Sequence, residues 1–401
     1  MDPCIAGHAV SKATRSGASQ TQSPTPAQQA SLAPAEKVPT AVTTKRSENG
    51  YVHQNPPNLP GPTMSLLVNA YCTALRLPEI SFPHEVIGRR DLSDPELRGH
   101  LNGFIGYVLQ FKKQEMTQAI YYTIQHIERV KNHLSIELSE DDFGALSDWA
   151  VKANAILFFT DGSIRNPVRE TILPPGEKIV LPPRPPEAFA RKARTDALLR
   201  EEGIRLPQSL PPVLDLSELD PQSPSDCARR VLGLFMAAVR AESLAAEEPL
   251  SLQDLRERLP GAFDCLTPAE RAFLLQDQPS VQEITNFTWR YECIALLLWS
   301  LGILDPLVAP NQISDVPAIA KTILSADQTA FVRGAKFRPV SEILDQQDIH
   351  YRLQWLSHQS RVDGKELPNG LLAGVITERL YALNWLTRTQ DVPWDDIETP
   401  A

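Results

Sequence analysis

The pattern of hydrophobic and polar positions divides the chain into segments of different character. Residues 1–63 contain no Phe or Trp, a single Tyr (Tyr51), and a high density of Ser, Thr, Gln, Ala and Pro. Such a stretch cannot bury enough apolar surface to offset the entropy lost on ordering. We therefore predict a disordered tail over residues 1–63. It is either a tether or docking arm, or an over-long translation start with Met64 as the true first residue, because composition fits both.

Residues 64–173 combine strand-like and helix-like patterns. Short apolar or alternating runs predict strands; they are Ser65–Cys72, Leu134–Leu138 and Ala155–Thr160. Apolar residues spaced three or four apart predict helices; these begin at Asp94-Pro95, near Met116 (running to Leu134), and after Ser139. Asp161-Gly162 follows the last strand as a hairpin signal. Because helices and strands interleave, the segment 64–173 is predicted to be a small α+β domain.

Three glycines lie inside the first of these predicted helices, at Gly99, Gly103 and Gly106. They cannot form a phosphate loop, since no Lys-Ser or Lys-Thr follows them. We expect them to give the helix a flat face against which another element packs closely.

A proline-rich stretch separates this segment from the rest of the chain. Residues 174–186 read PPGEKIVLPPRPP and include six prolines. Such a stretch is extended and semi-rigid, so we predict a linker there. Residues 187–401 then show only helical patterns, among them a capping box with an N1 proline at Thr267-Pro268-Ala269-Glu270 and a nearly all-apolar stretch within Val281–Leu301. We predict an all-helical domain over residues 187–401, with Val281–Leu301 as its central helix.

Charge and cysteine usage narrow the class of function. The net charge of −10 argues against binding to nucleic acid or to an anionic membrane surface, because both need a basic face. No signal peptide is visible, and the longest apolar run, Cys293–Leu301, is about half the length of a membrane span. The five cysteines lie far apart with no CxxC pair. These features predict a soluble cytoplasmic protein whose partner is another protein.

No catalytic or metal-binding motif was found. The chain contains neither G-x-S-x-G nor H-E-x-x-H. His126 and His133 are expected on one helix roughly 10 Å apart, too far to share a metal, and His100 is expected on a neighbouring helix. We therefore predict no metal and no cofactor.

The stretch from Trp289 to Trp299 is the most informative for function. Glu292 opens an otherwise apolar helical run, where an unpaired carboxylate would be costly to bury. One hypothesis makes Glu292 a cleft acid or base with a perturbed pKa. The other makes it a structural ion pair with an arginine from another helix; Arg191, Arg194 and Arg230 are the candidates. Arg290 lies two positions away, on a different side of the helix, and cannot be the partner.

Several runs resemble a known family. They are RKARTDALLREEGIRLPQSLPPV (Arg191–Val213), TWRYECIALLLWSLGILDPLVAP (Thr288–Pro310) and YALNWLTRTQDVPWDD (Tyr381–Asp396). The chain is similar here to the bacterial domain-of-unknown-function family 4272. Two further runs resemble the domain that precedes it in some members: RRDLSDPELRGHLNGFIGYVL (Arg89–Leu109) and WAVKANAILFFTDGSIRNP (Trp149–Pro167). The matching positions are Trp289, Glu292, Trp299, Gly302, Tyr381, Trp385 and Trp394.

The resemblance implies a bacterial, intracellular protein with a helical C-terminal domain, and it implies no activity, ligand or catalytic residue. We expect Trp394 to anchor the C-terminal segment while Asp395 and Asp396 stay solvated.

The leading hypothesis is a non-catalytic binding, regulatory or immunity-like protein. The alternative is an enzyme with a site around Glu292, in the helical domain or between the domains. A sealed ion pair would favour the former, and a solvent-accessible pocket would favour the latter.

Overall fold

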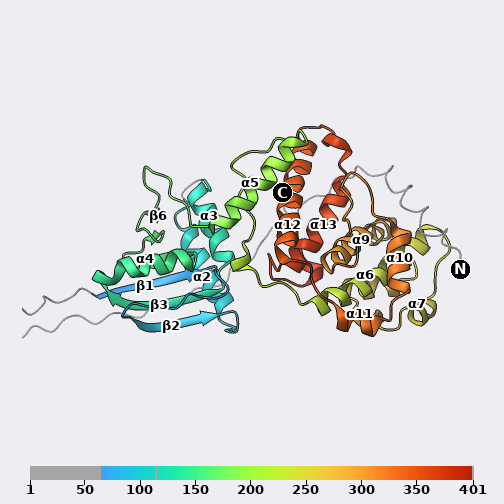
Figure 1. Ribbon diagram of the computed structural model, residues 1–401, viewed down its shortest axis with the longest axis horizontal. Helices are drawn as coiled ribbons and strands as arrows, with labels where there is room; N and C mark the ends of the chain where they lie inside the picture. Colours follow the sequence, from blue (N-terminus) through green and yellow to red (C-terminus); the bar gives the residue numbers. More distant parts are fainter. Residues whose placement is uncertain (1–64, 113–114, 400–401) are drawn as a thin grey trace, which may run out of the picture.

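The computed structural model describes residues 65–112 and 115–399. The predicted tail over residues 1–63 lies outside this part of the chain. A strand-containing region lies at one end of the molecule, and a helical region lies at the other (Figure 1). The predicted fold class, α+β followed by all-helical, is confirmed.

The first region is built on a six-stranded antiparallel sheet in the order β2-β3-β1-β4-β5-β6. The strands are β1 (Ser65–Cys72), β2 (Glu85–Asp91), β3 (Asn132–Ser139), β4 (Ala155–Phe159), β5 (Ile164–Arg165) and β6 (Thr171–Leu173). In the middle, Val68 of β1 faces Ile136 of β3, and Ala70 faces Leu157 of β4. The Asp161-Gly162 hairpin joins β4 to β5 as expected.

Helices cover both faces of this sheet. They are α2 (Leu97–Leu109), α3 (Gln118–Glu128) and α4 (Phe143–Lys152). Leu146 and Trp149 of α4 pack on one face, where Val68, Ala70 and Cys72 of β1 also point. Phe104 of α2 and Ile120 of α3 pack on the opposite face, with Tyr71. Successive β1 residues therefore enter opposite cores, as the strand period requires.

Two predicted helix boundaries in this region were wrong, and one strand was missed. Helix α2 begins at Leu97, because Asp94 forms a turn in which its carboxylate accepts from the Glu96 N–H at 2.8 Å. Helix α3 ends at Glu128, and Leu134 belongs to strand β3. Strand β2 was not predicted; most of its side chains are exposed, so it shows no apolar pattern.

The glycines of α2 do not pack against another element. Gly99, Gly103 and Gly106 are exposed, and a Cβ added to any of them would meet nothing within 4 Å. The buried face of the helix is formed instead by its larger residues, such as Leu101 and Phe104. The predicted close approach was wrong, because the glycines lie on the solvent side.

The second region contains helices joined by loops, and no strand among its described residues. Its α-helices are α5 (Pro186–Glu201), α6 (Pro224–Ala245), α7 (Leu252–Arg258), α8 (Pro268–Leu275), α9 (Val281–Ser300), α10 (Val316–Leu324), α11 (Gln328–Gly334), α12 (Val340–Val362) and α13 (Ala373–Leu386). The buried second half of α9 packs against α6 and α13, so α9 is the central helix, as predicted. The capping box between Thr267 and Glu270 is present. Among the described residues, no helix is long and apolar enough to cross a membrane.

The two regions meet at a buried carboxylate that follows the proline-rich stretch. Glu218 is fully buried and accepts from Arg129 of α3 at 2.7 Å. Its second oxygen accepts from the Asp215 N–H at 3.0 Å. The Leu75 N–H donates to the carbonyl of Ser217 at 2.8 Å. Glu218 therefore links the helical region to the sheet region, while residues 174–185 connect them covalently without a helix or strand.

Candidate functional site

The sequence makes Glu292 and its surroundings the main candidate site. Its partner is Arg379 of α13, whose Nη2 and Nε donate to Glu292 Oε2 at 2.9 and 3.1 Å. Ser314 completes the set, since its N–H donates to Oε1 at 2.7 Å and its Oγ donates to Oε2 at 2.8 Å. Arg379 also donates to the carbonyl of Val308 at 2.6 Å. An ion pair is present, but the predicted partner helices were wrong.

This ion pair is sealed from solvent. Glu292 is 3% exposed and Arg379 is 0% exposed. The cavity beside them measures about 10 Å³, no more than one water requires. Burial lowers the pKa of Arg379, and the Glu292 carboxylate opposes that shift. Because both carboxylate oxygens are engaged and no substrate could enter, the pair joins α9 to α13 and to the loop at Ser314.

Arg290 points to a different side of α9, as expected from its spacing. It donates to Glu378 at 2.9 Å, and its guanidinium lies 4.4 Å from the centre of the Tyr381 ring. Cys293 Sγ lies 3.1 Å from the same Glu378 carboxylate. Burial opposes protonation of Arg290, but the Glu378 charge prevails and raises its pKa. This second pair is also structural, although it keeps partial solvent contact.

The three arginines proposed as partners of Glu292 lie elsewhere. Arg191 and Arg194 of α5 both meet Asp345 of α12, at 3.2 and 3.7 Å. Arg230 of α6 pairs with Glu270 of α8. The reason is packing: α5 lies against α12, and the start of α6 lies against α8, so neither places an arginine at the side of α9 that carries Glu292.

The tryptophans that flank Glu292 are packing residues. The Trp289 ring lies so close to Gly374 at the start of α13 that an added Cβ there would be 3.0 Å from it. The guanidinium of Arg338 lies 3.8 Å from the centre of the Trp299 ring. Trp394 is buried against Tyr381 and Trp385, so it anchors the C-terminal segment as predicted.

The histidines are arranged differently from the prediction. His133 lies on β3 rather than on the helix of His126, and its ring is 4.3 Å from that of His100 on α2. Burial lowers the pKa of His133 to about 3. His100 Nε2 lies 3.1 Å from the hydroxyl of Tyr71. Within the described ranges, no three His, Cys, Asp or Glu side chains are grouped as metal ligands would be.

An open cleft lies where the two regions meet, with a volume of about 260 Å³. Its walls come from α3, the end of the proline-rich stretch, α5 and the loop 208–212. Apolar and proline side chains form most of the surface: Tyr122, Leu181, Pro182, Phe189, Leu210, Pro211 and Pro212. Tyr122 donates to the carbonyl of Ser209 at 3.0 Å, which fixes one wall to α3.

Three cationic side chains also line this cleft, and none of its lining residues is acidic. Arg129 is paired with Glu218, and Lys192 donates to Asp196 at 2.6 Å. Arg184 donates to the carbonyl of Pro212 at 2.9 Å, but no described carboxylate lies within 4 Å of it. Burial and the charge of Arg129 lower the pKa of Arg184 to about 10. The cleft therefore has an excess of positive charge in a chain whose net charge is −10.

This cleft is hardly visible in the sequence. Arg184 lies inside the proline-rich stretch, whose composition predicts only a linker. The one indication in the sequence is an arginine placed between two pairs of prolines.

Comparison with known proteins identifies the family of the helical region. No curated protein and no solved structure matches the chain. A family model described as "Domain of unknown function (DUF4272)" matches residues 191–397, slightly more than half of the chain. Arg129 and Arg184 of the cleft precede that match, whereas Glu292 and Arg379 lie inside it. The chain belongs to the family described as Domain of unknown function (DUF4272).

Proposed function

We propose that this chain is a non-catalytic protein-binding protein that recognises an acidic segment of a partner through the cleft between its two regions. The observation that carries the proposal is Arg184, a largely buried guanidinium without a carboxylate partner among the described residues, in a cleft lined by two further cations. An incoming carboxylate would restore the interactions that burial removes from Arg184.

The apolar part of the cleft favours a protein segment as the ligand. Phe189 and Leu181 line the cleft and are 52% and 40% exposed. Tyr121 and Ile179, which adjoin lining segments in the sequence, are exposed as well. Aromatic residues and arginine are enriched in protein–protein interfaces, and exposed apolar surface rimmed by polar groups marks binding sites. We expect the partner segment to present acidic side chains beside an apolar one.

The enzyme hypothesis centred on Glu292 finds no support in this geometry, because that carboxylate is fully hydrogen-bonded and sealed. A bacterial, cytoplasmic location is part of the proposal. It rests on the family resemblance and on the four described cysteines, Cys72, Cys227, Cys265 and Cys293, which are all free, as is usual in a reducing compartment.

Photo-crosslinking in the native cell tests the proposal. A photoreactive phenylalanine analogue replaces Phe189 in the full chain, and a control chain has it at Val362, which is 66% exposed at the end of α12. We expect a discrete protein adduct from position 189 only. Arg184→Glu should abolish the adduct, because it replaces the unpaired cation by a carboxylate, which repels the acidic segment of the partner.

The matched control is Arg200→Glu, which changes an exposed arginine on α5 outside the cleft. It should leave the adduct unchanged. The proposal fails if both positions give the same adducts, or if the adduct persists in the Arg184→Glu chain.

A further inference from the structure

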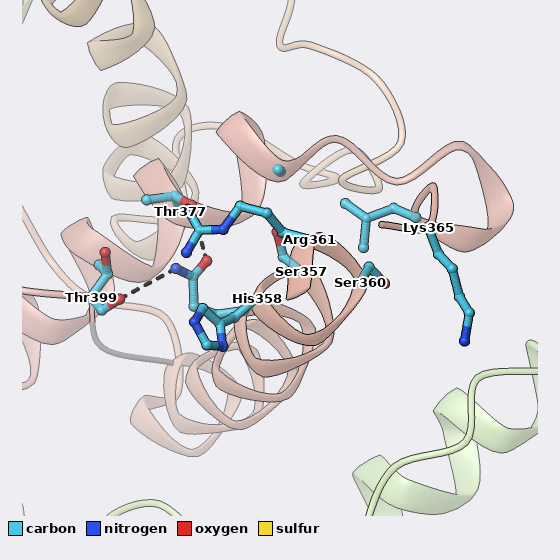
Figure 2. Close-up of a pocket in the computed structure, with 10 residues that line it drawn as sticks. Ser357, His358, Ser360, Arg361, Lys365, Thr377 and Thr399 are labelled. Carbon is cyan, nitrogen blue, oxygen red and sulfur yellow. Dashed lines mark hydrogen bonds between the residues drawn. The ribbon is translucent and has the colours of Figure 1, made fainter. Parts of the chain in front are cut away.

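A second cavity, larger than the cleft, lies in the helical region where α12 ends and α13 begins. It measures about 680 Å³ and is lined by residues of both helices and by Thr399. Figure 2 shows these side chains around the end of α12. Small-molecule sites commonly have volumes of about 300–1,000 Å³. The cavity is therefore large enough for a metabolite-sized ligand and larger than a single ion needs.

Polar side chains with fixed positions form one wall. Gln354 accepts from Thr377 Oγ1 at 2.9 Å and donates to the carbonyl of Thr399 at 3.3 Å (Figure 2). Ser360 also lines the cavity; it is 9% exposed, and its hydroxyl has no hydrogen-bond partner within the described part of the chain. Because it opens into the cavity, the Ser360 hydroxyl is available to hydrogen-bond a ligand there.

The charge of the cavity is positive. Its lining includes His358, Arg361 and Lys365, and none of its ten lining residues is acidic. Arg361 has no carboxylate within 4 Å among residues 65–112 and 115–399. Its side chain reaches across towards Thr377, whereas Lys365 points away (Figure 2) and pairs with Asp363 at 3.1 Å. Arg361 is thus the cation available to a bound anion.

The N-terminus of α13 adds to this positive potential. Helix α13 has 14 residues, and no side chain caps it at Leu372. Ala373, its first residue, lines the cavity, as does Thr377 one turn later. The first N–H groups of a helix have no intrahelical partner, and the helix dipole places partial positive charge there. Anions, phosphate groups in particular, bind at such termini.

We propose that this cavity binds a small phosphate monoester of a polyhydroxylated compound. The phosphate would lie between Arg361 and the start of α13, where a guanidinium and backbone N–H groups can both donate to it. The remainder of the ligand would contact hydroxyl and amide groups, including Ser360 and Gln354. This site is independent of the proposed protein-binding cleft, with which it shares no lining residue.

Isothermal titration calorimetry of the full chain tests the proposal, with glucose 6-phosphate, AMP and inorganic phosphate as probes. We expect at least one ester to bind more tightly than inorganic phosphate. Arg361→Ala should weaken that binding by about tenfold or more, since a charge-assisted hydrogen bond is lost. Ser360→Ala should weaken it by less.

Arg76→Ala is the control, since Arg76 is exposed and lies in the sheet region away from the cavity. It should leave the affinity unchanged, and circular dichroism should show all three variants folded. Equal affinity of the wild type and Arg361→Ala for the tightest probe would overturn the proposal. The proposal would also be overturned if inorganic phosphate bound and neither ester did, or if none of the three probes bound detectably.

Discussion

Replacing Glu292 by alanine is the sharpest test of how the helical region is held together. The carboxylate accepts from Arg379 twice and from Ser314 twice, at 2.7–3.1 Å. The substitution leaves the Arg379 guanidinium buried at 0% exposure with its charge uncompensated. Breaking such a pair from one side costs about 3–5 kcal/mol of folding free energy.

The glutamine variant should be less damaging. Its carbonyl can take the place of Oε2 and keep the bonds from Arg379 and from Ser314 Oγ. Its amide then faces the Ser314 N–H, which loses its acceptor. One unsatisfied buried donor and a lost charge should cost roughly 1–3 kcal/mol, so Glu292→Gln should lie between the wild type and Glu292→Ala.

Urea denaturation followed by tryptophan fluorescence measures these differences, because Trp289 and Trp299 lie on the same helix as Glu292. Arg98→Ala serves as the control. It breaks an ion pair with Asp391 whose side chains are 56% and 48% exposed, so it should change stability by about 0–1 kcal/mol. If Glu292→Ala is no less stable than Arg98→Ala, the sealed pair does not hold α9 to α13 and the reasoning is refuted.

Four further outcomes are expected. Gly103→Ala should stabilise the protein by about 0.5–1 kcal/mol in urea denaturation, because the added methyl meets open space and alanine favours helix; a loss of stability would contradict this. Gly374→Ala should instead destabilise by roughly 1–3 kcal/mol, since its Cβ would lie 3.0 Å from the Trp289 ring; unchanged stability would show that the ring moves freely. Glu218→Ala removes the partner of the nearly buried Arg129 and so weakens the contact between the two regions. Limited proteolysis within residues 174–185 should therefore be faster. An unchanged cleavage rate would show that the Arg129–Glu218 pair does not hold the two regions together. Burial raises the pKa of Glu242 above its ordinary 4.5, so near this pH the folded state keeps a proton that the unfolded state loses, and the stability should fall as the pH rises past 4.5. The urea midpoint of Glu242→Gln should not show this fall. If the midpoints of the wild type and the variant changed with pH in parallel, the prediction would be contradicted.

Local chemistry along the chain was enough to place most of the helices. The capping box at Thr267 and the N1 proline that follows it fix the start of α8. Helix α9 was predicted over Val281–Leu301 and spans Val281–Ser300. Such starts depend on hydrogen bonds between residues three positions apart, so the sequence alone contains the information. Strand β1 was also predictable, because both of its faces enter apolar cores and its sequence is therefore a nearly continuous apolar run.

The contacts between distant segments were decided only by the tertiary structure. Nothing near Glu292 indicates that Arg379, rather than Arg191 or Arg230, is its partner, because that depends on which faces of α9, α13, α5 and α6 pack together. Likewise, strand β2 is a strand because β3 supplies its hydrogen bonds, although its own side chains are mostly exposed.

The residues of the two candidate binding sites are likewise brought together only by the tertiary structure. The cleft at Arg184 gathers residues from α3, the proline-rich stretch, α5 and the loop 208–212, and the cavity at Arg361 gathers residues from α12, α13 and Thr399. By itself the sequence determined the local elements and the apolar character of the helix around Glu292, whereas the sealing of Glu292 came from the fold. Whether a charged side chain meets a partner or stays open to a ligand depends on groups far away in the chain, which only the folded arrangement brings together.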